Sequence, residues 1–260
     1  MYARVALEER CSMVQIAGCG ERWNRLGIVT PTEWRAATDA VILAARLIAK
    51  PGELLVWLDE PCALAVAHRA PEKSLGIRLG AYTLVLFDRD GQLLKTLPLA
   101  GTSAEEVGSW LSKQGFNTAW KTDLPSSLSH AALSNLDRTI SNVHETIGRI
   151  AGLTHGSSPV HTDPQTLETI MVIRLASREG ESARLIVLGF SPEGEQGEIF
   201  VRTEPGDGEP SDLRLAMREV AAKSDVDAQA TLVELFLHKS LEQAYGSLSR
   251  EWRPRRPSTL

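Results

Sequence analysis

Apolar residues recur at helical spacing in the first part of the chain. The run Thr30-Pro31-Thr32-Glu33 offers an N-cap, a proline suited to the first turn and a glutamate that completes a capping box. The apolar positions that follow are three or four residues apart, at Trp34, Ala37, Val41, Ala44 and Ile48. Pro51-Gly52 then ends the run. This pattern predicts a helix that begins near residue 31 and buries one face.

The following segment has the pattern of short strands. Four apolar stretches are the candidates: Leu54–Leu58, Ala63–Ala67, Tyr82–Phe87 and Gln92–Leu97. The last two flank a turn in which Asp90-Gly91 favours the positive φ angles of a tight hairpin. A second capping box, from Ser103 to Glu106, predicts a short helix that ends at Gly115.

The second part of the chain repeats this order of elements. A long helix is predicted to start near Pro125, with an apolar stripe that includes Leu136, Ile140 and Val143. Three strands are predicted next, at Thr169–Ala176, Arg184–Phe190 and Glu198–Thr203. Two further helices are predicted near Asp212–Ala222 and Val226–Leu248.

Successive strands joined by short turns pair in the antiparallel sense, because parallel crossovers need a dozen or more residues. We therefore expect an α+β fold in which antiparallel sheet packs with helices, in two similarly ordered halves of helix, strands and helix. The expected divisions are an N-terminal extension (1–20), a first half (21–124), a second half (125–249) and a basic flexible tail (250–260). The halves can form one domain or two, and their common order suggests a duplication.

The composition excludes some partners. The chain of 260 residues has a net charge of −5, whereas a surface that binds nucleic acid needs an excess of positive charge. No apolar run approaches the roughly 20 residues that span a bilayer. Cys11, Cys19 and Cys62 cannot close a disulfide framework, and residues 1–12 are too charged for a signal peptide, with Met13 as an alternative natural start. We expect a soluble, cytoplasmic protein that binds neither nucleic acid nor membrane.

Common cofactor and metal motifs are absent from the sequence. Gly18-Cys19-Gly20 resembles the glycine turn of a nucleotide site, but Trp23 occupies the third glycine position and no helix follows directly. The chain has no phosphate-binding loop, no G-x-S-x-G nucleophile elbow, no H-E-x-x-H and no paired-cysteine zinc site. We therefore expect no bound cofactor and no metal.

The best chemical cluster lies in the polar segment Gly152–Pro164, which is predicted to be a long loop. It contains His155, His161 and Asp163, which could ligate a metal or place a base beside Ser157 or Ser158. Surface histidines on a polar loop are the alternative interpretation. His144 lies beside the apolar stripe of its helix and is predicted to be a boundary residue.

Several segments together carry a resemblance that extends over most of the chain. They are Trp23-x-x-Leu26, Glu33-Trp34-x-x-x-Thr38, Leu84–Leu97, Ser158-Pro159-Val160-His161, Gly189–Gly194 and Leu235–Tyr245. In these segments the chain resembles an uncharacterised bacterial family of unknown function. Members of that family look rich in aromatic residues and histidine where this chain has Leu54–Trp57, and aromatic where it has Thr162-Asp163. Of such a pocket only His161 would be retained, and the resemblance implies no activity.

Two functional hypotheses follow. The favoured one is a non-catalytic binding or interaction protein, with a small-molecule ligand or a second copy of the chain as possible partners. It predicts an exposed apolar patch or a symmetric contact. The alternative is a small-molecule enzyme with its site at His155–Asp163, in which His161 is a general base or metal ligand and Asp163 orients it.

Overall fold

The computed structural model describes residues 23–50, 52–58, 63–66, 73–116, 122–154, 156–175, 184–204 and 210–250. Within these ranges the helices are α2 (Pro31–Ile48), α3 (Ala104–Lys113), α4 (His130–Leu153), α5 (Met217–Ala221) and α6 (Val226–Arg250). The predicted N-terminal extension (1–20) and all of the predicted tail except Arg250 lie outside the described residues, as do the three cysteines.

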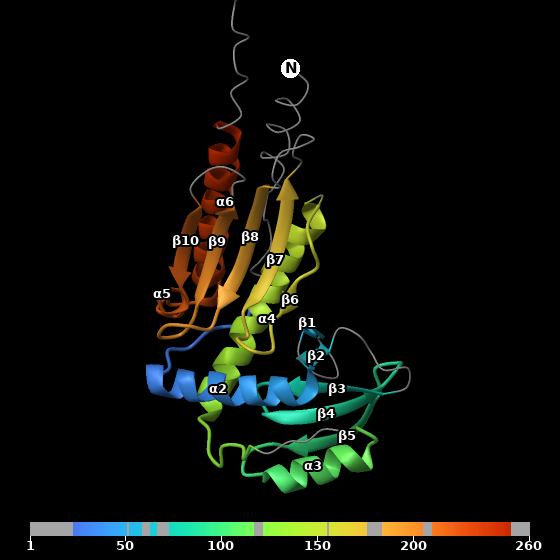
Figure 1. Ribbon diagram of the computed structural model, residues 1–260. Helices are drawn as coiled ribbons and strands as arrows, with labels where there is room; N and C mark the ends of the chain where they lie inside the picture. Colours follow the sequence, from blue (N-terminus) through green and yellow to red (C-terminus); the bar gives the residue numbers. More distant parts are fainter. Residues whose placement is uncertain are drawn as a thin grey trace, which may run out of the picture.

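Ten strands form one antiparallel sheet in the order β10-β9-β8-β7-β6-β1-β2-β3-β4-β5 (Figure 1). The strands of the first half are β1 (Leu55–Trp57), β2 (Leu64–Val66), β3 (Lys73–Arg78), β4 (Thr83–Asp88) and β5 (Leu93–Pro98). The strands of the second half are β6 (His161–Thr162), β7 (Thr169–Leu175), β8 (Arg184–Ser191), β9 (Glu198–Glu204) and β10 (Ser211–Ala216). The prediction of an α+β fold with antiparallel sheet is confirmed.

The two halves have the same order, and they meet at their first strands. In each half a long helix precedes a run of antiparallel strands, and further helix follows. β1 pairs with β6 through Leu55 and Thr162, so that the sheet continues from one half into the other. α2 contacts β2 and β3, while α4 contacts β7 and β8, and the two helices contact each other (Figure 1).

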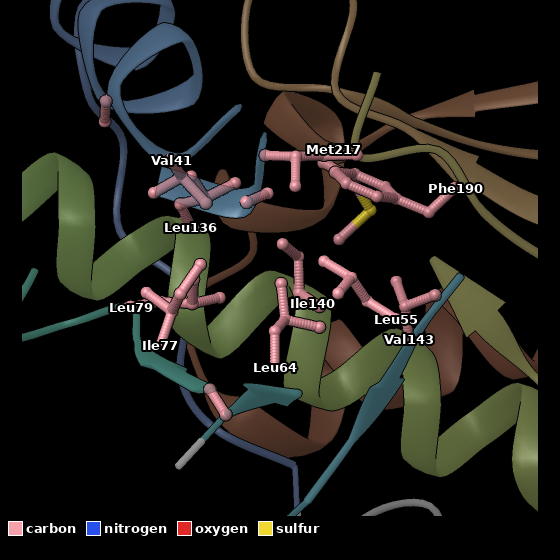
Figure 2. Close-up of a cluster of buried hydrophobic side chains, with 14 of the residues drawn as sticks. Val41, Leu55, Leu64, Ile77, Leu79, Leu136, Ile140, Val143, Phe190 and Met217 are labelled. Atoms are coloured by element: carbon pink, nitrogen blue, oxygen red, sulfur yellow. The ribbon is translucent and has the colours of Figure 1, made fainter. Parts of the chain in front are cut away.

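The buried core is shared by both halves. Figure 2 shows Val41, Leu55 and Leu64 of the first half beside Leu136 and Ile140 of α4. Phe190 and Met217 of the second half belong to the same cluster. Because apolar burial is the main stabilising term in folding, most of this stabilisation depends on both halves being present. The boundary predicted at residues 124–125 stays a prediction.

Local sequence signals account for several element ends. The Thr30 side chain accepts a hydrogen bond from the Glu33 N–H, and the Glu33 carboxylate accepts one from the Thr30 N–H, so the predicted capping box forms. The box from Ser103 to Glu106 forms in the same way. Gly91, at φ 82°, makes the turn between β4 and β5 as the Asp-Gly step predicts.

Three sequence predictions are wrong in detail. The segment Gly152–Pro164 is not one long loop: it contains the end of α4 and the central strand β6, and Ser157 forms an isolated bridge to Ile173. The long helix begins at His130 rather than near Pro125, because Ser129 is its N-cap. The first difference depends on β1, which lies far away in the sequence, whereas the second is set locally by the Ser129 cap.

The start of the predicted helix Asp212–Ala222 is also wrong. Residues 211–216 form β10, and only Met217–Ala221 are helical. Asp212 and Arg214 pair across the strands with Arg202 and Glu198 of β9, and such cross-strand pairs favour the strand. A short segment between a strand and a helix takes the structure that its neighbour in the sheet supports.

Candidate functional site

The structure gives His161 and Asp163 separate local partners. The His161 Nδ1 lies 3.3 Å from the Pro159 carbonyl oxygen. The Asp163 carboxylate accepts a hydrogen bond from the Gln165 N–H at 2.6 Å, and its main chain bonds to Leu167 and Glu168. Asp163 therefore shapes the turn between β6 and β7, and its carboxylate is not bound to the His161 ring. His155 lies outside the described residues.

The serine hydroxyls of the same segment also bond to main chain. Ser157 donates to the carbonyl oxygens of Ala151 and Thr154, each at 3.0 Å. Ser158 Oγ accepts from the Val172 N–H at 3.0 Å. These bonds fasten the segment to the end of α4 and to β7.

A buried polar group lies where the two halves meet. His144 of α4 is 8% exposed, which corrects the prediction that it lies at the boundary of the core. Its Nε2 is 3.0 Å from Thr162 Oγ1, which in turn is 2.8 Å from Thr169 Oγ1. The ring of Trp57 stacks on the imidazole, with 5.7 Å between ring centroids. Residues of β1, α4, β6 and β7 thus meet in one contact.

Burial lowers the pKa of His144 to about 4, and the neighbouring His161 contributes to the shift. Desolvation disfavours the charged imidazolium, so the ring is neutral near pH 7. A neutral imidazole nitrogen can donate or accept, which suits the Thr162 hydroxyl, while the face of the ring stacks on Trp57. This group stabilises the junction of the halves.

The most unusual arrangement is at the first described residues. We call residues 23–30 the N-terminal strap; it is irregular in structure and leads into α2. Asn142 of α4 binds both main-chain groups of Asn24: its Oδ1 accepts from the N–H and its Nδ2 donates to the carbonyl oxygen, each at 2.8 Å. A single side-chain amide thus makes the two main-chain hydrogen bonds that a neighbouring strand would otherwise make.

Two further contacts repeat this chemistry along the strap. Gln229 of α6 accepts from the Leu26 N–H at 2.8 Å and donates to the Leu26 carbonyl oxygen at 3.0 Å. At Gly27 two side chains bind the main chain instead of one: Asn135 Oδ1 accepts from the N–H at 2.8 Å, and Gln196 Nε2 donates to the carbonyl oxygen at 2.7 Å. We call the side chains of Asn135, Asn142, Gln196 and Gln229 the amide cradle.

Two apolar side chains anchor the same strap. Trp23 is 6% exposed and Leu26 is 1% exposed, whereas Asn24 and Arg25 between them are exposed. This pattern gives a structural reason for the Trp23-x-x-Leu26 element of the resemblance. The amide cradle holds the main chain, and the core receives the two side chains.

Sequence reasoning missed the amide cradle, although one signal was present. Asn135 and Asn142 are two helical turns apart and lie beside the apolar stripe of α4. Both are buried, at 3% and 1% exposure. Buried amides at helical spacing predict a polar partner across that face, but nothing in the sequence identifies the partner as main chain from residues 24–27.

An open surface groove of about 460 Å³ lies in the first half, between β5 and α3. Leu97 and Trp110 supply apolar surface, and Glu105, Glu106 and Lys113 surround it with charge. β5 has exposed positions along most of its length, with Leu93 and Leu94 46% and 43% exposed. Lys95, Pro98 and the irregular register opposite Leu86 and Phe87 are features that discourage pairing of an edge strand with another chain.

The structure and the comparisons define the class of the protein no further than its fold. It is an α+β protein with one continuous antiparallel sheet. No family model, no curated protein and no solved structure matches the chain. In the part of the chain that the structure describes, no three His, Cys, Asp or Glu side chains gather as a metal site would require. No helix among those residues is long and apolar enough to cross a membrane.

Proposed function

We propose that this protein is a non-catalytic binding protein whose amide cradle holds a polypeptide segment that has no regular secondary structure. The observation that carries the proposal is the binding of main-chain N–H and carbonyl groups at Asn24, Leu26 and Gly27 by side-chain amides. Main-chain contacts give affinity for a segment, and pockets for its side chains give specificity. Here the amide cradle supplies the main-chain contacts, and the core around Trp23 and Leu26 supplies the side-chain contacts.

The partner groups lie far from the strap in the sequence. Asn135 and Asn142 are 108 and 118 residues from their strap partners, and Gln229 is 203 residues away. All four residues of the amide cradle belong to the second half, whereas the strap leads into the first helix of the first half. The strap therefore occupies the second half as a ligand would, and a segment of another polypeptide with the same main-chain geometry would find the same partners.

The chemistry of the amide cradle favours binding over catalysis. Amides are neutral and do not ionise near pH 7, so these four side chains recognise donors and acceptors without acting as acids or bases. The candidate residues of the enzyme hypothesis, His161 and Asp163, bond locally to main chain instead. The contacts of the described residues thus support the binding hypothesis more than the enzymatic one.

A peptide-binding measurement on the full chain tests the proposal. Leu26→Ala weakens the anchoring of the strap and opens the amide cradle to a labelled peptide with the sequence of residues 22–30. We expect saturable binding by fluorescence anisotropy. Adding Gln229→Glu removes the donor to the carbonyl group at the Leu26 position and should raise Kd at least about tenfold, the equivalent of about 1.4 kcal/mol. Gln165→Glu, the same change at an exposed position, is the matched control.

Folding of each variant is checked by near-UV circular dichroism. If Leu26→Ala does not fold, Arg25→Ala is the milder substitution, because it removes exposed contacts of the strap, namely the bond from the Arg25 guanidinium to the Ser224 carbonyl oxygen and the charge attraction to Asp225. A folded chain with a weakened strap that binds no peptide, or that binds equally well with Glu at position 229, would show that the amide cradle is only a tether.

A further inference from the structure

The two edges of the sheet differ in how they are protected. Among the described residues, β5 and β10 each pair with one neighbouring strand only, so they form the two edges. β5 contains Lys95, Pro98 and a register shift, and all three hinder pairing with a further strand. β10 contains neither lysine nor proline, and its six residues pair with β9 without a shift. The β10 edge is therefore open to a further strand.

The main chain of β10 presents hydrogen-bonding groups along this edge. Ser211 and Met217, at the two ends of the strand, donate their N–H groups toward β9. The direction of the main-chain groups alternates from one residue to the next in a strand. The N–H and carbonyl groups of Asp212 and Arg214 therefore point away from β9, and a strand placed beside β10 would bond to them.

The side chains of β10 alternate between the core and a charged face. Leu215 belongs to the buried core, and Leu213 on the same face is half-buried. Asp212 and Arg214 are exposed on the opposite face, where the Arg214 guanidinium lies 2.9 Å from the Asp212 carboxylate and 2.8 Å from that of Glu198. A strand at this edge would thus meet one negative and one positive side chain, with a partly covered leucine between them.

We propose that a second copy of the chain occupies this edge, with β10 paired to β10 in the antiparallel sense about a twofold axis at Leu213. In this register Asp212 of each copy lies opposite Arg214 of the other. Both residues of such a pair present their main-chain groups to the edge, so they exchange both N–H···O bonds. The two Leu213 side chains lie next to each other and cover their exposed parts. This interface goes beyond the proposed function and does not depend on the amide cradle.

The charges of β10 select this register over its neighbours. Since only every second residue presents main-chain groups to the edge, the nearest alternative registers are centred on Asp212 or on Arg214. The first places the two Asp212 carboxylates opposite each other, and the second does the same with the two Arg214 guanidinium groups. Opposite charges stabilise a cross-strand pair, whereas like charges destabilise it. Only the register centred on Leu213 is complementary.

Sedimentation velocity at increasing concentrations of the full chain tests for this dimer. Strands of six residues bury little surface, so we expect a reversible dimer whose population rises with concentration. Asp212→Arg and Arg214→Asp each place like charges opposite each other, and each should raise the Kd of the dimer about tenfold. An equimolar mixture of these two variants should regain affinity close to that of the wild type, because every opposite pair then joins Arg to Asp.

Lys95→Glu is the matched control, because it reverses a charge on the other edge strand and should leave the Kd unchanged. Near-UV circular dichroism checks the folding of each variant. A wild-type chain that stays monomeric at every concentration would overturn the inference. A dimer that neither charge reversal weakens, or a mixture that does not regain affinity, would place the contact elsewhere on the molecule.

A disulfide trap tests the register itself. In the proposed dimer the Cα atoms of the two Leu213 residues are about 4.5 Å apart, within the range that a disulfide spans. Leu213→Cys should therefore give a covalent dimer under mild oxidation. Asp212→Cys, which lies opposite Arg214, should give no more than the wild type, whose own three cysteines set the background. Equal amounts of covalent dimer from both cysteine variants would contradict the register centred on Leu213.

Discussion

The two halves begin in the same way but fasten their first segments differently. The N-terminal strap leads into α2 and lies on the second half. The corresponding residues 122–129, which we call the second strap, lead into α4 and lie on the first half. There the Gly101 N–H donates to the Pro125 carbonyl oxygen, and the Ala104 N–H donates to the Asp123 carboxylate, each at 3.2 Å. No side-chain amide takes part in these two bonds.

The difference follows from the surface that each strap meets. The N-terminal strap lies against α4 and α6, whose interior main-chain groups are already used within the helices, so mostly side chains are available to bind it. The second strap meets the turn before α3, where main-chain N–H groups at a helix start are free to bond outward. Segments in equivalent places can therefore be held by different chemistry, and only the amide cradle offers several amides in a row.

The leucines of the two straps provide the largest test of this comparison. Leu26→Ala should lower the free energy of unfolding by about 3 kcal/mol, because it leaves a cavity at a fully buried position. Leu124→Ala, at 6% exposure in the second strap, should cost about 2 kcal/mol. Urea unfolding measures both. In Leu26→Ala, hydrogen exchange at the Asn24 and Gly27 amides should also quicken. If Leu124→Ala lowered the free energy of unfolding more than Leu26→Ala does, the second strap would be the more strongly anchored of the two.

The junction between the halves should respond to pH through His144. The unfolded chain binds a proton at this ring near pH 6.5, whereas the folded chain does so only near pH 4. Between these values the unfolded state holds more protons, so the free energy of unfolding falls as the pH decreases. The expected loss from pH 7 to pH 5 is roughly 2 kcal/mol.

Urea unfolding at several pH values tests this expectation in the wild type and in His144→Gln. The substitution should remove most of the slope between pH 7 and pH 5. His130→Gln, which changes an exposed histidine at the start of the same helix, is the matched control and should leave the slope unchanged. A slope that persists in His144→Gln would assign the pH dependence to other groups.

The smallest expected effect concerns the N-caps of α2 and α4, which are the last residues of the two straps. Thr30 forms a reciprocal capping box with Glu33, whereas the Ser129 side chain caps α4 by accepting from the Ala132 N–H and has no reciprocal bond within its own helix, its other partner being the Glu33 carboxylate of α2. Thr30→Ala should cost about 1 kcal/mol and Ser129→Ala about 0.5 kcal/mol in the free energy of unfolding. Serine in place of Thr30 keeps the cap and should restore most of the loss. Equal costs for both alanine substitutions would remove this distinction between the halves.

Strong local signals made much of the fold predictable. The first helix, the hairpin at Asp90-Gly91 and the strands near residues 169, 184 and 198 depend on spacing and turn residues that lie within a few positions of each other. β3, β6 and β10 were missed or misassigned. β6 contains only His161 and Thr162, and it is a strand because β1 and β7 lie on either side of it.

The sequence by itself determined the α+β class, the repeated order of helix and strands, and the absence of common cofactor motifs. The tertiary structure alone decided that His144 is buried at the junction and that Asp163 bonds to its own turn. It also decided that four amides from distant segments converge on the main chain of Asn24, Leu26 and Gly27. The reason is physical: periodicity and turn chemistry act over a few residues, whereas the partner of a buried amide is set by how complete helices pack together.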